Sequence, residues 1–82
     1  MEMRPRAISV VPIEEYKLII TFNNSEEKVF DVKPYFKFEQ FKELKDLIKF
    51  ATVKIAGLSI EWCNGADICP AELYYDSVPL EA

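Results

Sequence analysis

The sequence predicts an α+β domain: an antiparallel β-sheet of about five strands in two hairpin units, packed on one central helix, with a short C-terminal helix (β-β-β-α-β-β-α). Three observations favour this class. Residues 6–32 and 50–62 alternate between apolar and polar side chains, which is typical of strands with one buried face. Residues 38–48 repeat apolar side chains every three or four positions, as an amphipathic helix does. The segment 62–74 then combines a turn pair with a proline suited to start a helix.

The length predicts a single domain over residues 1–82, with loosely ordered ends at 1–5 and 77–82. A chain of this size buries only about 60 to 65% of the surface that its unfolded form exposes, so little core is to spare. Half of the residues are hydrophobic, which suffices for a packed core. We find no apolar run that could cross a membrane and no secretion signal, and therefore expect a cytoplasmic protein.

The charge pattern disfavours several functions. The net charge is −4, and the ten basic residues are dispersed among acids, so we expect no direct nucleic-acid binding by this chain. The sequence contains no histidine, which removes the usual general base at neutral pH and the commonest metal ligand. Many classes of enzyme are thereby excluded.

The N-terminal third predicts three strands. Residues 6–13 are rich in β-branched side chains, with Pro12 marking the end of the strand or an edge position. The next strand places every second residue on one face: Tyr16, Leu18, Ile20 and Phe22. A turn follows in which Asn24 is suited to a left-handed conformation, and residues 27–32 form the third strand.

The middle of the chain predicts one continuous helix after a break at Pro34. Its apolar stripe comprises Phe38, Phe41, Leu44, Leu47 and Ile48. We interpret this stripe as core packing, with Phe41 and Leu44 held between the two hairpins, because such stripes rarely serve any other purpose.

A second hairpin is predicted from residues 50–55 and 58–62, joined through Ala56-Gly57. Strand alternation places five side chains on one buried face: Val53, Ile55, Leu58, Ile60 and Trp62.

The segment after this hairpin predicts a turn and a helix start. Asn64-Gly65 tolerates positive φ at both positions, so the chain should reverse there. Pro70 suits the first position of a short helix, and Glu72 lies where its carboxylate can reach back to the N-cap amide. Asp67 is most simply a turn and helix-start acid, with a ligand-binding role as the alternative.

These features together resemble a bacterial family called domain of unknown function 2442. The residues that carry the resemblance span nearly the whole chain: Arg4-Pro5, Tyr16, Leu18, Phe22, Asn24, Phe30, Asp31, Phe41, Leu44, Trp62, Asn64, Gly65, Asp67, Leu73 and Tyr74. Two positions depart from the family pattern, since Ser25 stands where glycine is usual and Cys63 where proline is common. The resemblance implies a small α+β domain without an established activity, sometimes fused to a helix-turn-helix domain and sometimes encoded near toxin–antitoxin partners. Because this chain ends at Ala82, a DNA role would have to come from another protein.

The two cysteines predict no metal site and no cofactor. Cys63 and Cys69 would need carboxylates such as Asp67 and Glu72 to complete a zinc site without histidine, an uncommon ligand set. We interpret both as free structural thiols that pack as small hydrophobic side chains.

Four acids could instead converge to supply a general acid and a general base for hydrolysis: Asp31, Glu61, Asp67 and Glu72. The sequence has no nucleophile-elbow pattern and no glycine-rich phosphate loop, so we assign no catalytic residue and expect no enzyme.

We therefore hypothesise a protein-interaction or regulatory module, of toxin–antitoxin type, with a protein partner and no membrane contact. Its binding residues would be Trp62, Asn64, Asp67 and Tyr74, and two further tyrosines, Tyr35 and Tyr75, suit an interface. The alternative is a small-ligand or metal-binding domain with Trp62 and Asp67 lining a pocket. A self-associating domain, such as a homodimer, is the third hypothesis.

Overall fold

The computed structural model describes residues 5–80, whose strands form two antiparallel sheets. The first sheet has the order β1-β2-β3-β7 and contains β1 (Ala7–Ile13), β2 (Lys17–Phe22), β3 (Glu27–Asp31) and β7 (Val78–Pro79). The second has the order β4-β5-β6 and contains β4 (Lys54–Ala56), β5 (Ser59–Glu61) and β6 (Asp67–Ile68). The predicted α+β class with antiparallel hairpins is confirmed, although the strands divide between two sheets.

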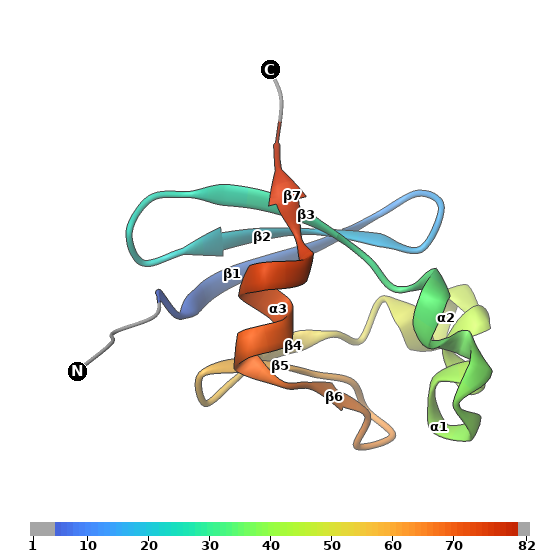
Figure 1. Cartoon of the computed structure of the whole chain (residues 1–82). Coiled ribbons are helices and arrows are strands. Elements are labelled where there is room, and N and C mark those ends of the chain that lie inside the picture. Colours follow the sequence, from blue (N-terminus) through green and yellow to red (C-terminus); the bar gives the residue numbers. More distant parts are fainter. Residues whose placement is uncertain (1–4, 81–82) are drawn as a thin grey trace.

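Short helices connect the sheets. Between β3 and β4 lie η1 (Lys33–Lys37), α1 (Glu39–Lys42), η2 (Glu43–Lys45) and α2 (Leu47–Phe50), where η denotes a 3-10 helix. Helix α3 (Pro70–Asp76) leads from β6 to β7 and so from the second sheet back to the first. Figure 1 shows α3 between the sheets, with the helices of residues 33–50 to one side.

The first sheet follows the predicted strand pattern. Leu18, Ile20 and Phe22 on β2 are buried, and Pro12 lies in the edge strand β1, opposite Leu18. Tyr16 differs from the prediction because it belongs to the turn before β2, where its φ is 57°. Its hydroxyl still donates a hydrogen bond to the carbonyl of Lys45 over 2.6 Å, which ties this turn to the helical segment.

In the turn after β2, the left-handed conformation occurs one residue later than predicted. Ser25, and not Asn24, has a positive φ, of 76°. The side chain of Asn24 accepts a hydrogen bond from the main-chain N–H of Glu26 over 3.1 Å, so Asn24 closes the turn through its amide.

The predicted continuous helix is broken at Asp46. This residue has extended dihedral angles, φ −71° and ψ 116°, and its carboxylate accepts from the Ile48 N–H over 2.9 Å. The acid therefore starts a new helical turn where the prediction continued the old one. Leu47 is 66% exposed and Ile48 80% exposed, which contradicts their assignment to the core.

The remaining members of the predicted stripe behave differently. Phe41 and Leu44 are buried as predicted, whereas Phe38 is half exposed. Phe50 enters the core from the last turn of α2, although we expected it to begin a strand.

The second hairpin is shorter than predicted and turns one residue later. Ala56 pairs with Ser59, so Gly57 and Leu58 form the turn, and Gly57 has a φ of 59°. This register exposes Leu58, while Ile60 lies in the core as predicted. The pairing of Ile60 with Ile68 adds strand β6, which the sequence analysis did not identify.

The C-terminal segment, which the prediction treated as a tail, contains strand β7. Val78 pairs with Val29 of β3, and the Leu80 N–H donates to the carbonyl of Glu27 over 2.9 Å. The predicted loose ends at 1–4 and 81–82 lie outside the described residues.

One apolar core joins both sheets and the helices. Its buried members are Ala7, Leu18, Ile20, Phe22, Phe30, Val32, Phe41, Leu44, Phe50, Ile60, Trp62, Ala66, Ile68 and Leu73. No helix within residues 5–80 is both long and apolar enough to cross a membrane.

Candidate functional site

Trp62, the first predicted binding residue, is a core side chain. It is 1% exposed, and its indole N–H donates to the carbonyl of Phe50 over 3.0 Å. Its ring meets that of Phe41 nearly at right angles, with centroids 5.7 Å apart. A buried indole with its single donor satisfied stabilises the fold and presents no surface to a ligand.

Asn64 connects the turn to α1. Its side-chain amide donates to the carbonyl of Gln40 and to the carboxylate of Glu43, each over 2.9 Å, and its oxygen accepts from the Ala66 N–H over 3.0 Å. The amide of Gln40 returns a hydrogen bond to the main-chain oxygen of Asn64 over 3.0 Å. These bonds engage the side chain in holding the loop.

Tyr74 packs against the first sheet. Its ring lies edge-on to Phe22 with centroids 5.0 Å apart, and the ammonium of Lys28 lies 3.9 Å from the centroid of the Tyr74 ring. Its hydroxyl donates to Glu26 over 2.5 Å. This hydrogen bond lowers the pKa of Glu26 and raises the pKa of Tyr74.

Asp67 is exposed on β6, directly after the turn that contains Asn64. It lines a hollow formed with α3's first residues, whereas the side chain of Trp62 lies in the core. The four predicted binding residues therefore do not form one site.

The cysteines are free, as predicted, but both are exposed, so neither packs into the core. No group of three or more cysteine, aspartate or glutamate side chains suited to a metal ion occurs in the described part of the chain.

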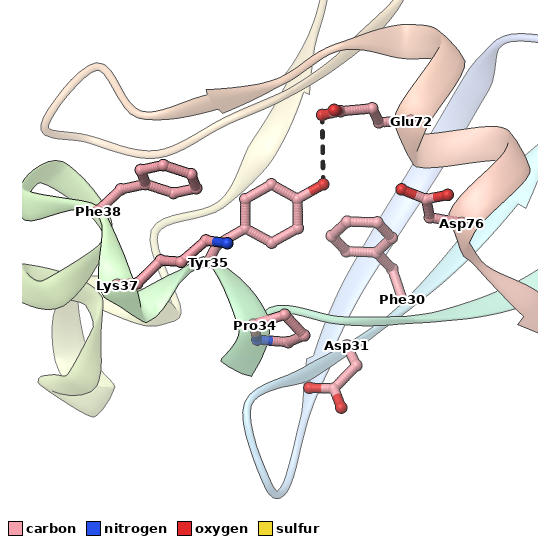
Figure 2. Close-up of a pocket in the computed structure, with 8 residues that line it drawn as sticks. All are labelled: Phe30, Asp31, Pro34, Tyr35, Lys37, Phe38, Glu72 and Asp76. Atoms are coloured by element: carbon pink, nitrogen blue, oxygen red, sulfur yellow. Dashed lines mark hydrogen bonds between the residues drawn. The ribbon is translucent and has the colours of Figure 1, made fainter.

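A different hollow lies between η1 and α3, with a volume of about 480 Å³ (Figure 2). We call it the aromatic groove, and its lining residues are Phe30, Asp31, Pro34, Tyr35, Lys37, Phe38, Glu72 and Asp76. The rings of Phe38, Tyr35 and Phe30 lie in a row, with Glu72 and Asp76 on α3 and Asp31 on the opposite side, nearest Phe30. This combination of an apolar wall and a few polar groups is typical of a binding site.

Local sequence explains how the groove forms. Pro34 fits the first turn of η1, where a missing N–H costs nothing, and it places Tyr35 toward α3. On α3, Glu72 and Asp76 are four residues apart and so lie on one helix face. The hydroxyl of Tyr35 donates to Glu72 over 3.2 Å across the groove, which joins its two walls.

The electrostatics keep Tyr35 neutral. Burial, and after it the negative charge of Glu72, raise the pKa of Tyr35 to about 12. Its phenol is therefore a hydrogen-bond donor at neutral pH and not a nucleophile.

One cation already lies against the groove's aromatic surface. The ammonium of Lys37 lies 5.3 Å from the ring centroid of Phe38. Lys33 is a second nearby cation, paired with Asp31 over 3.2 Å. Glu72 and Asp76 form no ion pair with any residue between 5 and 80, so the α3 wall keeps an unbalanced negative charge.

The sequence predicted only part of this groove. Tyr35 was expected as an interface tyrosine, and Asp31 and Glu72 as two of four acids that could converge. The structure places these two in the groove, and places Glu61 and Asp67 in the other hollow. Phe38 was predicted to lie in the core as the first member of the helical stripe, so its place in the groove was missed.

The fold and groove define a small α+β domain with a candidate binding site on its surface. A family model, "Protein of unknown function (DUF2442)", matches residues 7–79, and the chain belongs to this family. No curated protein and no solved structure matches the chain.

Proposed function

We propose that this domain is a protein-interaction module whose aromatic groove binds a basic, partly apolar segment of a partner protein. The observation that carries the proposal is the half-exposed ring of Phe38, with a lysine ammonium over it, in a groove whose α3 wall is acidic. An aromatic face attracts a Lys or Arg side chain, and nearby carboxylates strengthen this preference.

The charge of the chain supports a basic partner. A net charge of −4 attracts cationic surfaces over a distance of about 8 Å at physiological salt. The groove offers both contacts at once: Phe38 for the apolar stem and charge of a long basic side chain, and Glu72 or Asp76 for its terminal nitrogen.

Magnitudes limit the affinity. One exposed cation–π contact contributes about 0.5 to 1 kcal/mol, and an exposed ion pair at most about 1 kcal/mol. A single side chain in the groove therefore binds weakly, so the partner needs further contacts. Tyr75, exposed on α3 beside Asp76, is suited to provide one.

The proposal includes a cytoplasmic location and a regulatory role of toxin–antitoxin type, which rests on the family resemblance. It includes no catalytic step, since the groove's only phenol, Tyr35, remains protonated at neutral pH. The small-ligand alternative draws support from the second hollow, which contains Asp67.

The test is co-purification from the native cell with three baits: the unaltered chain, Phe38→Ala and Leu47→Ala. Leu47 is the matched control because it is also exposed and apolar, lies on the same helical segment and does not line the groove. We expect a specific partner that Leu47→Ala recovers as well as the unaltered chain does and that Phe38→Ala recovers in smaller amount.

Titration calorimetry with the purified partner completes the test. Phe38→Ala should weaken binding about fivefold, the equivalent of one cation–π contact. Equal affinities for Phe38→Ala and Leu47→Ala, or repeated recovery of the domain alone, would contradict the proposal.

A further inference from the structure

The second hollow lies on the three-stranded sheet, between the β4–β5 turn and the start of α3. Its volume is about 310 Å³, and it shares no lining residue with the aromatic groove. Its polar lining comes from Ser59, Glu61, Asp67 and Cys69, and its apolar walls include Leu58 and Pro70.

Two carboxylates face each other in this hollow. Glu61 of β5 and Asp67 of β6 are directly paired in the antiparallel register. Like charges in that position repel, because their Cβ atoms lie only about 4.5 to 5.5 Å apart. Lys54 stands opposite Glu61 on β4, yet neither acid forms an ion pair with any residue from 5 to 80.

Ser59 provides the independent observation. The residue is 5% exposed, and its Oγ has no hydrogen-bond partner within the described residues. Ser59 and Glu61 are two residues apart on β5, so their side chains lie on the same face of the sheet. A buried hydroxyl without a partner costs stability, and a ligand that hydrogen-bonds to it recovers that cost.

We propose that this hollow binds a small molecule that carries a guanidinium group on a short aliphatic chain. A guanidinium has five N–H donors in a plane, enough to bridge both carboxylates and to reach the Ser59 hydroxyl. Leu58 and Pro70 flank the aliphatic chain. The volume lies at the lower end of the range for ligand pockets, which fits a small molecule.

The chemistry favours a guanidinium over an ammonium. An ammonium is compact and strongly hydrated, and its three donors do not match two facing carboxylates in a plane. The two acids and the hydroxyl are all acceptors at neutral pH, so an anion finds only the hydroxyl as a donor.

The test is a nuclear magnetic resonance titration of the full chain with butylguanidinium, and with butylamine as the matched cation. We expect saturable shifts of the amide signals of Ser59, Glu61, Asp67 and Cys69, and binding of butylamine at least about fivefold weaker. Asp67→Asn should weaken butylguanidinium binding about tenfold or more, and Ser59→Ala about threefold. The exposed turn variant Glu14→Gln is the control and should bind normally.

A second measurement separates loss of binding from loss of folding. Asp67→Asn removes the repulsion with Glu61, so the variant without ligand should unfold at the same temperature as the unaltered chain or a higher one. Weaker binding by an equally stable protein then supports the site.

Several outcomes would overturn the inference: no saturable shift in these four amides, undiminished binding by Asp67→Asn, or equal affinity for butylamine. Tighter binding of an arginine-containing peptide than of butylguanidinium would overturn the small-molecule assignment. Phe38→Ala should leave butylguanidinium binding unchanged. The proposal for this hollow and the proposal for the aromatic groove are therefore tested independently.

Discussion

The turns at residues 22–26 and 62–66 share one backbone pattern but differ in their connections to the rest of the molecule. In each, the aromatic first residue donates its N–H to the carbonyl of the fifth and accepts from the N–H of the fourth. The bonds measure 2.8 and 2.9 Å for Phe22 with Glu26 and Ser25, and 2.8 and 3.0 Å for Trp62 with Ala66 and Gly65.

The third residue of both turns is asparagine, and its wider contacts differ. Asn24 bonds to Glu26, two residues away, through both the nitrogen and the oxygen of its side-chain amide. Asn64 makes the equivalent bond within its turn and also reaches Gln40 and Glu43 on the helical segment. In the first turn Glu26 makes the link to a distant element, by accepting from Tyr74, whereas in the second turn the asparagine itself links the loop to the helical segment.

The fourth residue differs in its tolerance of the turn geometry. Ser25 has a φ of 76° and Gly65 a φ of 88°, values that disfavour any side chain. Gly65 adopts this φ without strain in the turn at 62–66, whereas Ser25 is strained in the turn at 22–26.

The largest effect should separate the two asparagines. We expect Asn64→Ala to lower the free energy of unfolding by about 2 to 3 kcal/mol, because three hydrogen bonds are lost. Asn24→Ala should cost about 1 kcal/mol, since its bonds are local and exposed. Urea unfolding of both variants measures the difference. Equal decreases in the free energy of unfolding would contradict the inferred difference between the two asparagines.

An exchange of the fourth residues should have intermediate effects of opposite sign. Gly65→Ser should destabilise by about 1 to 2 kcal/mol, because its Cβ would meet the Gln40 side chain at 3.4 Å and its backbone would be strained. Ser25→Gly should stabilise by about 0.5 to 1 kcal/mol, the relieved strain less the entropy of glycine. Thermal unfolding of both single variants tests this, and a destabilising Ser25→Gly would refute it.

The smallest effect concerns pH and distinguishes the fifth residues, Glu26 and Ala66. The Tyr74 hydrogen bond lowers the pKa of Glu26 below 4.5, so its stabilisation is present above that pH and is lost as pH falls through the folded value. The raised pKa of Tyr74 means that the same bond is lost as pH rises through the folded value, which lies above 10.0.

Unfolding temperatures of Glu26→Gln and the unaltered chain should therefore converge in acid and differ at neutral pH. The exposed neighbour Glu27→Gln is the control. A constant offset between Glu26→Gln and the unaltered chain from neutral pH to about pH 2 would contradict the assignment.

The three N-terminal strands of the first sheet were predictable because their signals are local, whereas β7, which comes from the far end of the chain, was not. The alternation of apolar and polar residues correctly predicted that Leu18, Ile20 and Phe22 are buried, and Pro70 correctly predicted the start of α3. The helical segment was less predictable. The spacing of the apolar residues around Asp46 indicates a helix interior, whereas its carboxylate is suited to an N-cap, which is its role in the structure. Spacing alone could not decide between these roles.

The site was harder to predict than the fold. Trp62 and Asn64 attracted attention as distinctive residues, yet their hydrogen bonds hold the core and the loop. Tyr35 was predicted as an interface tyrosine and lines the groove, but its neighbours Glu72 and Asp76 come from a helix distant in sequence. Only the tertiary arrangement of η1 and α3 brings them together.

The break at Asp46 has a consequence for how the chain folds. No α-helical run between residues 33 and 50 exceeds four residues, and helices so short do not form alone in water. This segment therefore takes its shape only as Phe41, Leu44 and Phe50 dock against the sheets. A peptide of residues 33–50 would be unstructured, and the walls of the aromatic groove cannot assemble before the rest of the domain.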